Sequence, residues 1–221
     1  MKYYLDTEFI EGFHKPLFGK RRHHIDLISI GVVREDGESY YAICSDYEYK
    51  DADEWVKKNV ILPMYLDTVF GDARNHYDAS NFHKIYGKKK SVIVQELLEF
   101  FGCWRDVHFW RASKEVEIYG YYADYDWVLF CSLFGRMIDL PKGFPMYCKD
   151  LNQMVDEKAE SLITKGKGTH SEGNKWYAEN MGEALSYIKA LPNYPKQEKE
   201  HNALEDAKWN KKLHEFLTET D

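Results

Sequence analysis

The first 45 residues carry apolar runs that predict three short strands. Residues 2–5 are apolar and aromatic, and they predict a strand that ends at Asp6. Residues 25–33 are rich in β-branched side chains, and strand character returns over residues 39–44. The pair Asp36-Gly37 lies between these two runs and is a hairpin turn signal. The pattern therefore predicts antiparallel neighbours at the start of a sheet.

The rest of the chain alternates helical periodicity with short apolar runs. Residues 92–104 place Ile93, Leu97 and Phe101 at helical spacing, and residues 124–134 predict a helix that stops at Gly135. Helices are also predicted over residues 53–58, 151–158 and 201–217, strands over residues 116–121 and 145–148, and irregular segments over residues 60–90 and 164–175. The order β-β-β-α-α-β-α-β-α-α predicts an α/β fold, a mixed central sheet flanked by helices.

Length and charge narrow the class of protein. A chain of 221 residues is expected to form a single domain, residues 1–221. Its net charge of −7 excludes a protein that coats nucleic acid through an overall basic surface. Nucleic acid is still allowed as a substrate, because a site built from carboxylates carries negative charge that bound cations neutralise.

The cysteines and the N-terminal residues indicate a compartment. The four cysteines lie far apart without a C-x-x-C pair, which argues against a zinc knuckle and favours free thiols in a reducing cytosol. Asp6 stands where a signal peptide would have an apolar run, and no stretch holds the roughly 18 apolar residues of a membrane span. We therefore expect a cytoplasmic protein that does not enter a membrane.

Asp6 and Glu8 form the first candidate site, a D-x-E motif on the first predicted strand. Side chains two apart on a strand point to the same face. Two adjacent carboxylates repel each other unless a cation lies between them. A divalent-metal site at the end of the strand and a solvated pair on an exposed face both fit this short motif.

The second candidate lies in residues 121–127, Tyr-Tyr-Ala-Asp-Tyr-Asp-Trp, where a predicted strand runs into a helix. Open α/β sheets bind ligands at the carboxyl ends of their strands. Asp124 fits the role of a helix N-cap. Asp126 lies in the first helical turn, where a carboxylate also interacts favourably with the helix dipole. A metal-binding role and a structural role are both open for Asp126.

The third candidate is the pair His201 and Asp206, at the start of the last predicted helix. They are five positions apart, so they converge only if His201 sits just before the helix or in its first turn. Taken singly, such a His is usually a surface residue, and such an Asp usually interacts with the helix dipole. The order D-x-E, then Y-D at a helix start, then H-x-A-x-x-D favours one shared site.

These three motifs resemble the DEDDh exonuclease family, the DnaQ-like or RNase T-like group, which has an RNase H-like fold. Asp6 and Glu8 match its first motif, Asp126 matches the acid of its second, and His201 and Asp206 match its third. The sequence departs from the family at residue 122, where a Tyr stands in place of the usual Asn. The resemblance implies a 3′→5′ exonuclease in which these five residues are catalytic.

A narrower resemblance is to the RNase AS family of polyadenylate-preferring 3′→5′ exoribonucleases. It rests on residues 5–11, Leu-Asp-Thr-Glu-Phe-Ile-Glu, and on residues 121–128, which extend the second motif by Val128. It implies a homodimer that acts on the 3′ ends of single-stranded RNA and releases nucleoside monophosphates.

Four carboxylates without a cysteine or clustered-histidine ligand suit Mg²⁺ or Mn²⁺. Two such ions, about 3.5–4 Å apart, stabilise the charge that develops in phosphodiester hydrolysis and lower the pKa of the attacking water. We expect Asp6 to bridge both ions and Asp126 to support one of them. Glu8 and Asp206 are expected to complete the nucleophile-side ion. His201 is the expected general base, because a histidine with its usual pKa of about 6.5 accepts protons near pH 7.

Candidate substrate contacts surround these motifs. Phe9 either stacks on the terminal base, a contact worth roughly 1–3 kcal/mol, or packs in the core on the opposite face of the strand from Glu8. Tyr122 and Asp124 are further candidates because they flank Asp126. A basic cluster before the second predicted strand is expected to contact phosphates, and it consists of Lys15, Lys20, Arg21, Arg22, His23 and His24.

Three alternatives to an exoribonuclease stay open. A DNA exonuclease of the proofreading or repair type has the same motifs, because the sequence does not show whether 2′-hydroxyls are recognised. A hydrolase of small nucleotides would share the metal site. An inactive nucleic-acid-binding module is disfavoured because it has no need of all five catalytic positions.

Overall fold

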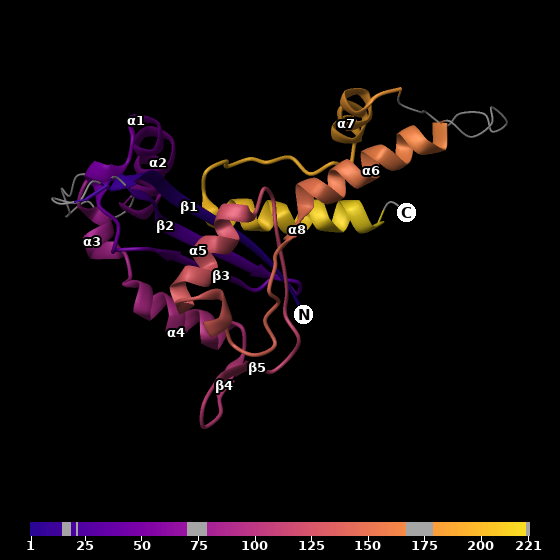
Figure 1. Ribbon diagram of the computed structural model, residues 1–221. Helices are drawn as coiled ribbons and strands as arrows, with labels where there is room; N and C mark the ends of the chain where they lie inside the picture. The colour runs from indigo at the N-terminus through magenta and orange to yellow at the C-terminus, as the bar shows by residue number, and fades with distance from the viewer. Residues whose placement is uncertain (15–18, 21, 70–78, 167–178, 220–221) are drawn as a thin grey trace.

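The computed structural model describes residues 1–14, 19–20, 22–69, 79–166 and 179–219. In this part of the chain the main sheet has five strands in the order β3-β2-β1-β6-β7, and β4 and β5 form a small second sheet. Helices lie on both faces of the main sheet (Figure 1). The predicted α/β architecture is confirmed, and the arrangement is consistent with an RNase H-like fold.

The first three strands are antiparallel neighbours, as predicted. They are β1 (Lys2–His14), β2 (Arg22–Arg34) and β3 (Ser39–Ile43). The prediction that the first strand ends at Asp6 is wrong, because β1 continues for eight residues beyond that position to His14. The apolar run stops at Leu5, but β2 offers backbone partners along the polar continuation. Asp6 and Glu8 therefore lie inside a long strand.

Two parallel strands complete the sheet. β6 (Glu117–Gly120) pairs with residues 2–4 of β1 and ends at Gly120, level with the start of the D-x-E motif. The chain then enters α5 (Asp124–Phe134), which has the predicted bounds. The strand predicted over residues 145–148 is displaced to β7 (Lys149–Asp150), because these two residues are the ones that reach backbone partners on β6.

Alternating side chains of β1 enter two different cores. Tyr3 and Leu5 are buried in the core shared with α4 and α5, whereas Tyr4 is buried in the core that includes α8. α8 (Ala203–Glu219) lies against β1 and β2 and supplies Leu213 to its core. The two faces of β1 therefore meet different helices.

The helical region after β3 is longer than the sequence pattern predicts. α1 (Glu54–Val56), a π-helical turn (Lys57–Ile61) and α2 (Leu62–Val69) follow one another without a break. The prediction of irregular structure over residues 60–90 is wrong for α2 and for α3 (Phe82–Tyr86), while residues 70–78 lie outside the described part. Pro63 misled the prediction, but it is the second residue of α2, directly after the π-helical turn, and the helical region continues through it.

The helix predicted over residues 92–104 ends early. α4 (Lys90–Phe100) stops before Gly102, whose φ of 63° is left-handed. The chain then forms a hairpin of β4 (Cys103–Arg105) and β5 (Trp110–Ala112). Trp104 of this hairpin continued the helical spacing from Phe101, which is why periodicity alone did not find the hairpin.

The C-terminal third forms a helical layer. α6 (Leu151–Gly166) extends past the predicted end at residue 158, and α7 (Met181–Ala190) was not predicted. α6 packs against both α7 and α8, and together with α7 it extends away from the sheet (Figure 1). Within the residues that the structure places, no helix is long and apolar enough to cross a membrane.

Gly31 allows α8 to lie directly on the sheet. A Cβ atom at this position would lie 2.2 Å from the Ala203 carbonyl oxygen and 2.6 Å from the Leu204 Cα. Gly31 is also the β2 residue opposite Asp6 in the strand register. The missing side chain therefore brings the start of α8 onto the part of β1 that carries the D-x-E motif.

We predict that Gly31→Ala lowers the stability of the fold. The added methyl group meets backbone rather than a flexible side chain, so α8 must shift, and such overpacking costs about 1–3 kcal/mol. Thermal unfolding should move down by several degrees. Gly182→Ala is the matched control, because its Cβ meets only the Asn180 Oδ1 at 3.5 Å. Equal unfolding temperatures for Gly31→Ala and the wild type would contradict the close approach.

Candidate functional site: an acidic cleft between β1, α5 and α8

Asp6 and Glu8 face α8. They lie on the same side of β1 as Tyr4, which is buried in the core on the α8 side. In the strand register Asp6 lies opposite Gly31, and Glu8 lies opposite Ser29. Both carboxylates are half-buried. The alternation of one strand thus places two acids beneath the first turn of α8.

α8 supplies the third carboxylate. Asp206 lies in its first turn and is buried, and single oxygens of Asp6, Glu8 and Asp206 lie within 4.8 Å of one another. The Gln197 side-chain N–H donates to Asp206 Oδ1 at 2.5 Å. Further along the helix, Asn210 donates to the Leu5 carbonyl oxygen at 3.0 Å and ties α8 to β1 beside Asp6.

The turn before α8 carries His201. Asn202 caps the helix, since its side-chain oxygen accepts the N–H groups of Leu204 and Glu205, both at 3.2 Å. His201 has a φ of 65°, a left-handed conformation that residues other than glycine rarely adopt. The backbone reverses here, so His201 lines the same cleft as Asp206 although the two are five positions apart.

Asp126 reaches the cleft from the opposite face of β1. Its Oδ1 accepts the Thr7 backbone N–H at 2.7 Å and the Thr7 hydroxyl at 2.6 Å. Asp126 is buried, whereas Asp124 is exposed at the first position of α5. The expected N-cap role of Asp124 is wrong, because Ala123 occupies that position and its N–H donates to Asp150 Oδ2 at 2.8 Å.

The cleft is aromatic around its acidic floor and encloses about 430 Å³. Phe9 lies on the α5 side of β1, stacks on Tyr125 with ring centroids 5.6 Å apart, and still lines the cleft. Phe9 therefore packs on the face of the strand opposite Glu8, as one alternative predicted, and its ring also lines the cleft. Tyr122 is largely exposed and has a φ of 52°. Tyr122 and His201 are the two described non-glycine residues with positive φ, and both line this cleft.

Burial raises the pKa of each of the four acids in the cleft, and repulsion from neighbouring carboxylates adds to it at Asp6 and Glu8. Burial is the largest cause for Asp6, whose pKa lies well above its usual value, and the charges of Asp126, Glu8 and Asp206 add to it. Burial, with Asp206 and Asp126, raises the pKa of Glu8 to about 8. Burial raises the pKa of Asp126 to about 6 against the two Thr7 hydrogen bonds. Burial also raises the pKa of Asp206, although the bond from Gln197 opposes it.

This donor set fits hard divalent cations. The three clustered side chains offer carboxylate oxygens, which Mg²⁺ and Mn²⁺ prefer. The raised pKa values show that the negative charges are unfavourable in the protein alone. A bound cation reverses that effect, because an opposite charge within a few ångströms favours the ionised form of each acid.

The basic cluster predicted to contact phosphates is described only in part. Arg21 lies outside the described residues, and Arg22 is placed only through its backbone at the start of β2. His23 Nε2 lies 2.9 Å from Glu11 Oε1, and His24 Nε2 lies 3.5 Å from Asp26 Oδ2. Each histidine of the cluster therefore has a neighbouring carboxylate.

Several residues that shape the cleft were not found from the sequence. The Thr7 side chain donates a hydrogen bond to Asp126, and the Gln197 side chain donates one to Asp206. The Asn210 side chain ties α8 to β1. Asn210 had a usable signal, because it follows Asp206 by four residues and so lies on the same helix face. Gly31 had another, since a glycine inside a strand indicates close approach of backbone. Gln197 lies in a loop and had no signal.

The mixed sheet and the acidic cleft are consistent with a nuclease of DEDDh type. A family model described as the 3′-5′ exoribonuclease Rv2179c-like domain matches residues 2–218. The match covers nearly the whole chain, and the chain belongs to this family of 3′-5′ exoribonucleases. The resemblance to DEDDh exonucleases is thereby confirmed.

Two curated relatives come from Mycobacterium tuberculosis. They are the 3′-5′ exoribonuclease MT2234.1 of strain CDC 1551 and the 3′-5′ exoribonuclease Rv2179c of strain H37Rv. Each is 29% identical to this chain over 160 residues, which cover 72% of this chain and 76% of the relative. The expected enzyme class is confirmed by the family match and these names.

We predict that the metal-free protein loses stability as pH rises from 6.5 to 8. The pKa of Glu8 in the folded state, about 8, lies above its usual value of 4.5. The folded state therefore holds this proton while the unfolded state has released it, and stability falls through this window. Asp6 adds to the fall with the same sign. Chemical denaturation in EDTA should show a fall of about 1–2 kcal/mol over this range.

Glu8→Gln tests the origin of this pH dependence. The neutral side chain removes one of the repelling charges, so the variant should lose less stability between pH 6.5 and 8. The pKa of the buried His214 is lowered to about 4 in the folded state, so its titration near pH 6.5 in the unfolded state adds the same small rise in stability to both proteins and cancels in the comparison. A variant with the same pH slope as the wild type would contradict the assignment.

Proposed function

We propose that the chain hydrolyses RNA from its 3′ end with two divalent metal ions, Mg²⁺ or Mn²⁺. The observation that carries the proposal is the group of Asp6, Glu8 and Asp206 within 4.8 Å of one another, with His201 in the same cleft. The product is a nucleoside 5′-monophosphate, because water attacks the last phosphorus and the bond to the 3′-oxygen of the preceding nucleotide breaks.

The acids divide into two groups around Asp6. Asp6 would bridge the two ions, and Glu8 and Asp206 would complete one of them, in keeping with their clustered oxygens. Asp126 would support the other ion through Oδ2, because both Thr7 hydrogen bonds go to Oδ1. The bound ions supply charge stabilisation at the phosphate and lower the pKa of the attacking water.

His201 is the proposed general base. Its place beside the carboxylates lets an imidazole nitrogen take the proton of the attacking water. The left-handed backbone at His201 supports a functional role, since strained backbone conformations outside glycine cluster at functional sites.

The aromatic walls are suited to the terminal nucleotide. Phe9 follows Glu8 in the chain, and its partly exposed ring lines the cleft, where a base can stack on it. Tyr122 presents another exposed ring, and Asp124 presents an exposed carboxylate nearby in the chain. We propose a preference for adenylate and a homodimer on the resemblance to RNase AS. The four cysteines are free, which supports a cytoplasmic location.

We predict that Asp6→Asn and His201→Ala each reduce turnover by about 100-fold or more while the fold is retained. Asp6→Asn removes the proposed bridging charge, and His201→Ala removes the proton acceptor, which typically contributes about 10²–10⁴-fold. Single-turnover degradation of an end-labelled RNA measures both effects, and circular dichroism checks the fold. Asp36→Asn and His108→Ala are matched controls at exposed positions in other parts of the chain. Wild-type rates in both site variants would refute these roles.

The substrate is tested with matched, end-labelled poly(A), mixed-sequence RNA and single-stranded DNA, each with Mg²⁺, with Mn²⁺ and with EDTA. We expect monophosphates from RNA only in the presence of metal, and faster release from poly(A). Faster cleavage of DNA would favour a DNA exonuclease, and cleavage of dinucleotides alone would favour a small-nucleotide hydrolase. Activity in EDTA would contradict metal dependence.

A further inference from the structure

Trp55 lies against the proposed general base. It belongs to α1, and its side chain contacts that of His201 edge to face, with ring centroids 4.9 Å apart and planes at 80°. Trp55 is nevertheless 53% exposed. A large aromatic ring that stays half in solvent contributes little to the core, so its contact with His201 needs another explanation.

α1 is anchored firmly enough to hold the indole in place. The Asp53 side chain caps it by accepting the Val56 N–H at 2.8 Å. The π-helical turn that follows buries Val60 and Ile61 in the core on the α4 and α5 side. π-helical turns of this kind are frequent at functional sites. The segment therefore has a fixed base and an exposed aromatic end.

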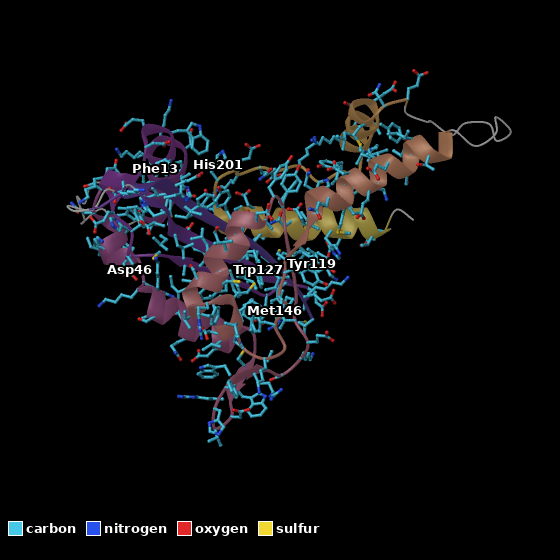
Figure 2. The ribbon with its side chains drawn as sticks, in the orientation of Figure 1. Phe13, Asp46, Tyr119, Trp127, Met146 and His201 are labelled. Atoms are coloured by element: carbon cyan, nitrogen blue, oxygen red, sulfur yellow. The ribbon has the colours of Figure 1, made fainter. Side chains whose placement is uncertain are left out.

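The chain that carries His201 meets this helical segment at two points. Besides the ring contact with Trp55, the Lys199 ammonium lies 3.5 Å from Asp67 Oδ2 on α2. Both partners of this ion pair are more than half exposed, so it contributes little by itself. Figure 2 shows His201 where the chain enters α8, on the side of the molecule where α1 lies.

We propose that Trp55 is a positioning residue for His201, and this inference rests on the proposed role of His201 as the general base. The indole limits the orientations of the imidazole, whose backbone is already held in a left-handed conformation. A correctly oriented base accelerates proton transfer without binding the substrate more tightly. Loss of the indole therefore lowers kcat and leaves KM nearly unchanged.

A competing role for Trp55 is to bind a nucleobase. Trp55 also lines a neighbouring hollow together with Glu8, Phe9 and Phe13, and an exposed indole there can stack on a base. The two roles differ in kinetics, because loss of a stacking surface raises KM. They also differ in their dependence on His201, because only the positioning role acts through that residue.

The test compares Trp55→Ala, Trp55→Phe, His201→Ala and the double variant Trp55→Ala/His201→Ala, with kcat and KM measured on single-stranded RNA. Trp104→Ala is the matched control, because Trp104 is 49% exposed in the β4–β5 hairpin, which lies far from α1 (Figure 1). Thermal unfolding checks each fold. Two-dimensional NMR of the histidine rings adds a direct readout. The indole ring changes the chemical shifts of the His201 ring, so Trp55→Ala should move these signals.

We expect Trp55→Ala to lower kcat by about 3- to 10-fold, the range of an aromatic pair, with KM changed less than about 2-fold. Trp55→Phe should recover most of the rate, and Trp104→Ala should match the wild type. Trp55→Ala should add no loss in the His201→Ala background. Unchanged kcat, a loss confined to KM, an additive double variant, or unmoved His201 signals would each overturn the inference. Wild-type turnover of His201→Ala would instead remove the proposed general base itself.

Discussion

The direct contact between α8 and Gly31 is the constraint on which the acidic cleft depends. It allows the first turn of α8 to lie on β2, so that Asp206 comes within 4.8 Å of the acids of β1. Burial raises the pKa of all three carboxylates there, and repulsion adds to it at Asp6 and Glu8, so their charges are costly in the protein alone. The apolar side of α8, with Leu213 fully buried and Trp209 nearly so, offsets the repulsion and keeps the helix in place.

One strand supplies both sides of the site. The even-numbered Asp6 and Glu8 face α8, while the intervening Thr7 faces α5 and holds Asp126 through two donors. The two carboxylates of β1 therefore flank a threonine that positions a third carboxylate, Asp126. The two described non-glycine residues with left-handed backbone, Tyr122 before α5 and His201 before α8, both line the cleft. Each of these helices thus begins two residues after a residue that lines the cleft.

The sequence predicted the sheet class and picked out five residues that line one cleft, because these depend on local patterns, while the catalytic roles of the five stay a prediction. Runs of β-branched and apolar residues indicated β2 and β3, and acidic residues indicated the N-terminal ends of α5 and α8. It did not predict the length of β1, because the pairing that continues beyond Leu5 comes from a distant partner strand. The same reason hid the contact of Trp55 with His201, since 146 positions of chain separate two rings that only the folded protein brings together. The β4–β5 hairpin was missed because its Trp104 continues the helical spacing.

The central claim is that the clustered acids hold protons in the free protein and release them to divalent cations. Calorimetric titration of the metal-free protein with Mn²⁺ near pH 7, in buffers that differ in ionisation enthalpy, measures this directly. Burial and the charges of Asp206 and Asp126 raise the pKa of Glu8 to about 8, and burial, with the charges of its neighbours, raises the pKa of Asp6. We predict tight binding with a net release of about one proton or more per protein. Binding without proton release, or no binding, would contradict the account.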